Sequence, residues 1–175
     1  MKKIITFIIA IAISFIPGII GIMFTPINGG DAWFNALGKS ALNPDAWVFG
    51  VAWTLLYTIL GCALYLIIRD PSHMRDKIGS YLYFGMHIIL NAAWSYVFFG
   101  CHMPMPALMI VAVLILISIW MMMSFMSLRR VAGWLVLPYV IWLIFAAYLN
   151  GTTVFMQYNL NGMVDAITYI MSYIK

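Results

Sequence analysis

Charge is what this sequence has least of. Only 8% of its 175 residues are Asp, Glu, Lys or Arg, and glutamate is absent altogether. Soluble domains carry about 25% charged residues, so this chain has too few ionic groups to cover a surface that faces water. Its hydrophobic content is 65% and its mean hydropathy is +1.02. We therefore predict an integral membrane protein.

The scarcity of reactive and charged groups also excludes several kinds of site. Cys62 and Cys101 lack the spacing of metal ligands, and Cys62 falls inside an apolar run, so we expect neither a disulfide nor a metal site. The nine Lys and Arg residues are scattered between apolar runs, which argues against a groove for nucleic-acid phosphates. No acid–base pair or nucleophile constellation is evident, so no catalytic residue is assigned.

Long apolar runs are what the sequence does contain. About 20 apolar residues cross the bilayer core as a helix, and helix is the open-chain structure that pairs every backbone group in lipid. Five segments qualify: 4–24, 47–68, 81–99, 107–126 and 131–155. The first resembles a signal peptide, but its apolar stretch is too long and no cleavage site follows, so we interpret it as a span kinked at Pro17. These runs predict one all-α domain over residues 1–175, a five-transmembrane-helix bundle.

Two segments lie outside these spans. Residues 26–46 form a long loop in which Trp33, Phe34 and Leu37 recur at helical spacing, which predicts a short interfacial helix. Long loops inside compact domains are commonly lids or binding loops, so we expect this one to cover a ligand site. The C-terminal tail, 156–175, is mildly apolar but too short and polar to predict as a span, and it is compatible with the membrane surface.

The distribution of basic residues predicts the orientation. With five spans, one side of the membrane holds seven of them: Lys2, Lys3, Arg69, Arg75, Lys77, Arg129 and Arg130. The other side holds only Lys39 and Lys175. Because Lys and Arg are enriched in cytoplasmic loops, we expect a cytoplasmic N-terminus, with the C-terminus and the loop 26–46 on the opposite side.

Aromatic and polar residues recur at intervals of about one helical turn inside three of the spans. They are Trp53 and Tyr57 in the second span, His87, Asn91, Trp94 and Ser95 in the third, and Trp142 and Ala146 in the fifth. Aromatic walls with a few polar tips and a small-residue gap are typical of a pocket for a flat apolar ligand. Spacing alone leaves open the alternative that the polar groups join helices and the aromatics form an interfacial belt.

His87 is the one histidine inside a span. No second histidine or carboxylate lies in any span, so a metal cage or a proton relay lacks partners. We expect a hydrogen-bonded structural histidine that modulates a neighbouring pocket. Axial ligation of a haem iron stays open as an alternative, because one proximal histidine suffices for haem.

Three segments resemble the signature segments of the TspO/MBR family, the translocator proteins or peripheral-type benzodiazepine receptors. They are "WFNALGKSALNPDAWVFGVAWTLLYTILGCAL", "LNAAWSYVFFG" and "LVLPYVIWLIFAAYLNG", which together run from Trp33 to Gly151 in the family's order. The resemblance implies a five-helix membrane bundle that binds tetrapyrroles such as protoporphyrin IX and other flat aromatic molecules, with porphyrin or haem as ligand and no cofactor required.

Carried over residue by residue, the family's ligand pocket falls on nine positions. They are Trp33, Phe34, Trp53, Tyr57, Asn91, Trp94, Ser95, Trp142 and Ala146. The chain departs from the family pattern in the loop, where Lys39-Ser40 replaces Lys-Pro and Asn43-Pro44 replaces paired prolines, and at His87, where the family has glutamine. The sterol motif of animal members is absent, so cholesterol handling is not predicted.

The resemblance favours a membrane receptor or sensor for tetrapyrroles, and leaves open whether it aids their transport or breakdown. One alternative is a secondary transporter, although no span holds a carboxylate and no inverted repeat is evident. Another is a light-dependent porphyrin-degrading enzyme that uses Trp53 and Trp142. The expected partners are the lipid bilayer and a tetrapyrrole, with a homodimer as a family-level expectation.

Overall fold

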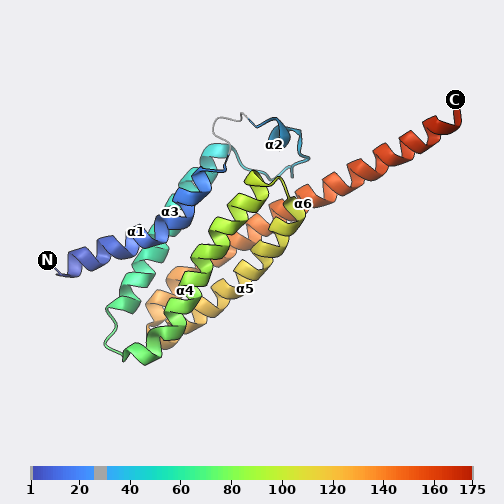
Figure 1. Cartoon of the computed structure of the whole chain (residues 1–175). Helices are drawn as coiled ribbons and strands as arrows, with labels where there is room; N and C mark the ends of the chain where they lie inside the picture. The colour runs from blue at the N-terminus through green and yellow to red at the C-terminus, as the bar shows by residue number, and fades with distance from the viewer. Residues whose placement is uncertain (1, 26–30, 175) are drawn as a thin grey trace.

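The computed structural model describes the backbone of residues 2–25 and 31–174 and the side chains of these residues up to 159. Every regular element in the described part is helical. The elements are α1 (Lys2–Ile22), α2 (Ala32–Ala36), α3 (Ala46–Ile68), α4 (Met74–Ser95), the π-helix η1 (Tyr96–Gly100), α5 (Pro104–Leu128) and α6 (Arg130–Ile174). Figure 1 shows α3, α4, α5 and α6 running alongside one another, with α2 across one end.

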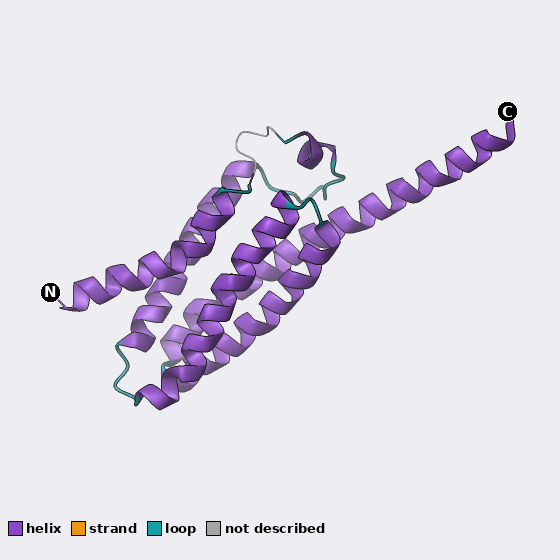
Figure 2. Ribbon diagram, in the orientation of Figure 1, coloured by secondary structure: helices purple, strands orange, loops and turns teal. Residues whose placement is uncertain are grey.

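Five of the helices are long and apolar enough to cross a membrane, which confirms the predicted all-α bundle. They span Lys2–Ile22, Ala46–Ile68, Met74–Gly100, Pro104–Leu128 and Arg130–Asn159. Short turns join the last four spans, the longer loop that carries α2 joins the first two, and the ribbon contains no strand in the described part (Figure 2). Pro17 lies inside α1, as expected.

Two boundaries differ from those expected. The third membrane-spanning helix, α4, starts at Met74 instead of residue 81. The polar residues before 81 can be helical because the ammonium of Lys77 finds hydrogen-bond acceptors. The Lys77 ammonium is buried and donates to the backbone carbonyl oxygens of Asp70 and Ile68. At the other end of the chain, α6 continues without interruption through the segment interpreted as a separate tail, and projects beyond the bundle (Figure 1). No proline breaks this stretch, and polarity alone does not end a helix.

The helices pack in a fixed set of pairs. α1 contacts α3 and α4, α5 contacts α4 and α6, and α3 contacts α6. Gly61 of α3 allows α1 to approach closely, because a Cβ at this position would lie 2.8 Å from the Cα of Ile11. Ser14 of α1 strengthens the same contact by donating a 2.7 Å hydrogen bond to the carbonyl oxygen of Tyr57. The core between α3, α4, α5 and α6 is built from Leu60, Leu114, Met121, Phe125, Tyr139 and Leu143.

An ionic staple joins two turns at the end of the bundle opposite α2. The Nε of Arg129, between α5 and α6, donates a 2.9 Å hydrogen bond to Oδ2 of Asp70, between α3 and α4. Oδ1 of Asp70 accepts hydrogen bonds from the hydroxyl and the backbone N–H of Ser72. The bonds from Ser72, and then those from Arg129, lower the pKa of Asp70 to about 2. The carboxylate therefore stays ionised and keeps the two turns together.

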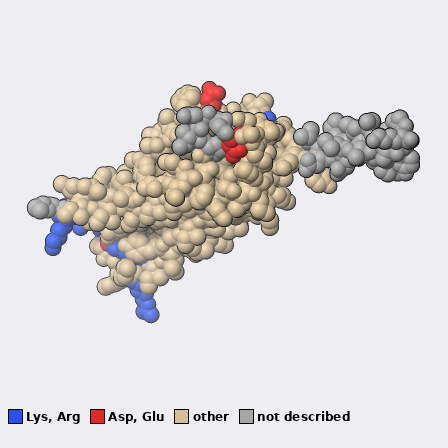
Figure 3. All heavy atoms as spheres, turned by 45° about the horizontal axis from the view of Figure 1, so that its top comes forward, with Lys and Arg blue, Asp and Glu red and all other residues tan. Residues whose placement is uncertain are grey.

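Among the residues whose side chains are described, charge lies at the two ends of the bundle. Figure 3 shows Lys and Arg side chains near the start of α1 and around the turns at that end, and acidic side chains near α2, with an uncharged surface between them. Because lipid hydrocarbon excludes ionised side chains, this uncharged band is the part of the surface suited to the bilayer core.

Candidate ligand-binding site

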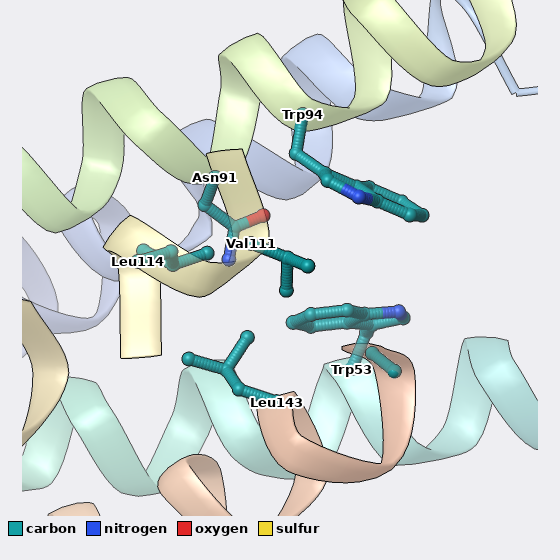
Figure 4. Close-up of a pocket in the computed structure, with 7 residues that line it drawn as sticks. Trp53, Asn91, Trp94, Val111, Leu114 and Leu143 are labelled. Atoms are coloured by element: carbon teal, nitrogen blue, oxygen red, sulfur yellow. The ribbon is translucent and has the colours of Figure 1, made fainter. Parts of the chain in front are cut away.

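A small cavity lies between four of the spans. It is lined by Trp53 from α3, Asn91 and Trp94 from α4, Val111 and Leu114 from α5, and Leu143 and Ala146 from α6. In Figure 4 the indole rings of Trp53 and Trp94 face each other across this space, with the Asn91 amide and the aliphatic side chains at one end of it. Four of the nine positions expected at the site, Trp53, Asn91, Trp94 and Ala146, therefore meet around one cavity.

The cavity is narrow. Its open volume accommodates about one water molecule, because the two indole rings and Leu143 nearly fill the space between the helices. A flat ligand larger than water therefore has to displace these side chains. The apolar walls favour an aromatic guest, since a stacked ring replaces the contacts that the indoles lose.

Asn91 joins three helices at the floor of this cavity. Its Oδ1 accepts a 3.2 Å hydrogen bond from the hydroxyl of Tyr57 on α3. Its Nδ2 donates a 2.7 Å hydrogen bond to the hydroxyl of Tyr139 on α6. The side chain is 3% exposed, so these bonds explain how an amide is tolerated inside a span. An amide has two donor hydrogens and two acceptor lone pairs, so one of each remains beyond these two bonds.

Sequence spacing did not point to Tyr139, because the expected face of the fifth span was followed in steps of four residues through Trp142 and Ala146. An α-helix turns once in 3.6 residues, so steps of four drift by about 40° each. The face of α6 that turns toward the cavity and Asn91 therefore includes Tyr139, three residues before Trp142, and Leu143, three residues before Ala146. A count at mixed spacings of three and four would have found both.

The same drift of about 40° turns Ser95 away from the face of α4 that carries Asn91. A Cβ added to Gly21 of α1 would lie 3.0 Å from Oγ of Ser95, so Ser95 packs between α4 and α1 and does not line the cavity. Tyr57 also lies behind the cavity wall. Its ring packs against Gly18 of α1, while its hydroxyl reaches Asn91.

Aromatic rings support the Trp53 side of the cavity. Trp53 stacks on Tyr57 with 5.4 Å between the ring centroids and 26° between the planes. Trp142 meets it edge-on at 6.3 Å and 85°. Trp142 does not line the cavity, and its buried indole N–H has no hydrogen-bond partner among the described residues. It is placed to hold the Trp53 ring in position from behind.

Trp94 is anchored by a hydrogen bond. Its Nε1 donates to Oδ1 of Asn150 on α6 at 3.2 Å, and Nδ2 of Asn150 donates to the carbonyl oxygen of Pro104 at the start of α5 at 2.9 Å. The indole ring stacks on Phe98 of η1 at 5.1 Å and 20°. Trp94 is therefore fixed on one edge by α6 and on one face by the π-helix.

His87 is fully buried one turn before Asn91 but does not line the cavity. It packs edge-on against Tyr139 at 4.9 Å and tilted against Phe84 at 5.5 Å. By distance and angle, neither ring nitrogen has a hydrogen-bond partner among the described residues. The polar group that interacts with the ring is the backbone of Phe84, one turn earlier, so a hydrogen-bonded histidine stays a prediction. Since its ring abuts Tyr139, His87 touches the cavity only through the Asn91–Tyr139 pair.

The loop before α3 covers the aromatic end of α4. The expected short helix is α2, and Oδ1 of Asp31 caps it by accepting hydrogen bonds from the backbone N–H groups of Trp33, at 2.8 Å, and Phe34, at 3.3 Å. Trp33 packs edge-on against Phe98 at 5.8 Å, and Phe34 packs against Phe99 at 5.5 Å. Trp33 and Phe34 thus lie above the cavity without lining it, and positions 26–30 of the loop fall outside the described residues.

Farther along, the same loop reaches α6. The hydroxyl groups of Ser40 and Tyr148 are 3.2 Å apart. A Cβ added to Gly38 would lie 2.7 Å from Cβ of Met156, so only glycine fits where the loop crosses the helix. Contacts with η1 and α6 therefore hold the described part of the loop, 31–45, over the end of the bundle nearest the two facing tryptophans.

Comparison with known proteins identifies relatives of this chain. The chain is 30% identical over 151 residues to the Tryptophan-rich protein TspO of Chlorobaculum tepidum, covering 86% of this chain and 95% of that protein. It is 31% identical to the Tryptophan-rich sensory protein of Cereibacter sphaeroides over 74% of this chain and 79% of the relative. It is 29% identical to the human Translocator protein over 67% and 70%. The family model of the TspO/MBR family matches residues 8–156, and the chain belongs to this family.

Proposed function

We propose that the protein is a membrane receptor that binds flat aromatic molecules of the tetrapyrrole class between Trp53 and Trp94. The observation that carries the proposal is the pair of indole rings facing each other across the cavity (Figure 4). Two facing aromatic planes suit a flat, mostly apolar guest, because stacking against both faces replaces the contacts between the rings and their present neighbours.

The polar part of the site supports a ligand with hydrogen-bonding groups. Asn91 keeps one donor and one acceptor in reserve beyond its bonds to Tyr57 and Tyr139. A tetrapyrrole core offers both N–H groups and unprotonated nitrogens, which an amide can pair with. The other lining groups, Val111, Leu114 and Leu143, are aliphatic and favour the apolar remainder of such a ligand.

The names of the relatives are compatible with a receptor and also with a carrier. Relatives are called sensory protein and translocator protein. The one carboxylate in the described spans, Asp76, is exposed in the first turn of α4, so none lies deep in the bundle where it could couple transport to an ion gradient. Both a receptor and a carrier must bind the ligand, and the cavity beneath the loop supports this binding step.

Titration of the purified full chain with protoporphyrin IX tests this function. Binding is followed in the dark by the shift of the porphyrin absorbance band, with a sterol as the comparison ligand. We expect saturable one-site binding of the porphyrin and none of the sterol. Equal binding of both would contradict the proposed ligand class. Repeating the titration under light, with analysis of the products, separates a receptor from a light-dependent porphyrin-degrading enzyme.

A further inference from the structure

His102 occupies an unusual backbone position in the turn between η1 and α5. Its φ is 57°, in the left-handed region, and it is the one non-glycine residue with positive φ among those described. The N–H of Met103 donates to the carbonyl oxygen of Val97 at 3.1 Å, the long-range bond of a helix C-cap. Glycine is the usual residue at the left-handed position of such a cap. A histidine there is disfavoured by its Cβ, so its side chain is expected to contribute something that glycine would not.

The side chain of His102 is joined to the loop by two contacts. Its Nε2 lies 3.4 Å from Oδ2 of Asp31. Its ring stacks on Trp33 with centroids 4.2 Å apart and 13° between the planes. The two carboxylate oxygens of Asp31 therefore make different contacts: Oδ1 caps α2, and Oδ2 faces the imidazole.

Both contacts strengthen when the imidazole is protonated. An imidazolium attracts the carboxylate, and a cation stacked on an indole face gains from the negative potential of the ring. The other titratable groups in the segments that meet here are Lys39, whose ammonium lies 4.1 Å from the centre of the Phe34 ring, Cys101 in the same turn as His102, and Tyr96 at the start of η1. Asp31 is the acid that the described structure pairs with His102.

A chain of ring contacts connects the His102–Asp31 pair to the cavity. Trp33, which His102 covers, packs on Phe98 at 5.8 Å, and Phe98 stacks on Trp94 at 5.1 Å. Trp94 is one of the two facing indoles. Release of α2 would therefore remove a neighbour of the aromatic stack that supports this wall of the cavity.

We propose that His102 and Asp31 form a proton-controlled latch that holds α2 over the end of the bundle. Protonation of the imidazole fastens the latch, and deprotonation loosens it. The consequence for ligand exchange, faster entry and release at higher pH, rests on the proposed function. The latch itself does not depend on any ligand.

Hydrogen exchange of the backbone amides of α2 measures the latch without a ligand. The full chain in detergent is compared at pH 5.5 and pH 8, with correction for the intrinsic exchange rates, on the peptide that contains Trp33 and Phe34. We expect protection about two- to fivefold greater at the lower pH, as suits an ion pair that is half exposed, with side-chain exposures of 45% for His102 and 22% for Asp31. Equal protection at the two pH values would overturn the proposal.

Two variants separate the latch from other sources of pH dependence. Asp31→Asn removes the charge and keeps a good helix cap, so α2 should remain folded and its protection should become independent of pH. His102→Asn tolerates the left-handed backbone and does not titrate, and it should have the same effect. If either variant keeps the pH dependence of the parent, the latch is contradicted. Because no porphyrin is used, failure of the porphyrin titration would leave this result standing.

Discussion

The amide of Asn91 and the hydroxyl of Tyr139 are joined by a 2.7 Å hydrogen bond that links α4 to α6 beneath the cavity. This hydrogen bond has two structural effects. It satisfies a polar group that lipid could not, and it fixes the direction of the amide on the floor of the cavity. The same pair is the contact through which the buried His87 adjoins the site, since His87 packs edge-on against the ring of Tyr139.

Tyr139→Phe should destabilise the bundle by about 1 kcal/mol, because it leaves a buried Asn91 donor unpaired. The expected loss in the free energy of unfolding lies between the mean of about 0.6 kcal/mol for side-chain hydrogen bonds in membrane proteins and the roughly 1–3 kcal/mol for a buried group left without a partner. Thermal unfolding in detergent, followed by circular dichroism, measures the effect. Tyr158→Phe is the control, since Tyr158 is 79% exposed. If the two variants unfold alike, the hydrogen bond contributes nothing.

Ala146→Phe should weaken porphyrin binding, because Ala146 borders the cavity and a ring there would occupy its remaining space. Overpacking of a filled interior typically costs about 1–3 kcal/mol, so affinity should fall by about tenfold or more. The measurement is the porphyrin titration together with thermal stability. Ile144→Phe is the matched control, since Ile144 is 55% exposed on the same helix. Parent-like binding by Ala146→Phe would remove this position from the site.

Acid should loosen the staple between Asp70 and Arg129. The folded-state pKa of Asp70 is lowered to about 2, below the value of about 3.9 for an aspartate in an unfolded chain. Its stabilising contribution is therefore complete above about pH 5 and is lost as the pH falls toward 2. Asp70→Asn should lower the melting temperature at pH 6 and flatten its decline between pH 5 and 2. Asp76→Asn, at an exposed position, is the control and should keep the parent profile. An unchanged acid profile in Asp70→Asn would exclude the staple as its cause.

The charge distribution predicts the orientation in the membrane. Seven Lys and Arg residues lie at the start of α1 or in and next to the turns that join α3 to α4 and α5 to α6, while Lys39 lies in the loop that carries α2. We expect the N-terminus in the cytoplasm and the end that carries α2 outside it. Reporter fusions at both termini test this arrangement. Finding the two termini on one side would contradict a crossing number of five.

The fold could be predicted from the sequence because apolar length has few structural solutions in lipid. A run of about 20 apolar residues must form a helix to satisfy its backbone, and five such runs correspond to the five spans. The boundaries were less certain. The start of α4 depends on Lys77 reaching carbonyl oxygens across a turn, which is a tertiary contact that hydropathy does not register.

Part of the cavity lining could be predicted from the sequence, whereas ligand binding by these residues stays a prediction. Helical spacing and family resemblance both singled out Trp53, Asn91, Trp94 and Ala146, and these four side chains line one cavity. Ser95 turned toward α1, since steps of four residues drift around the helix. His102 left no signal at all. Its significance lies in a positive φ and in a partner, Asp31, that is remote in sequence, and neither can be seen in a pattern of residue types.

The central claim is that Trp53 and Trp94 hold the ligand between them. Dissociation constants for protoporphyrin IX, measured by absorbance for the parent, Trp53→Ala, Trp94→Ala and Trp134→Ala, test it most directly. Trp134 lies on α6 and is 60% exposed, which makes it a matched control. Losing one stacking partner is worth about 1–3 kcal/mol, so each cavity variant should bind at least about fivefold more weakly while Trp134→Ala binds like the parent. Equal affinities for all four proteins would contradict the account and place the ligand elsewhere.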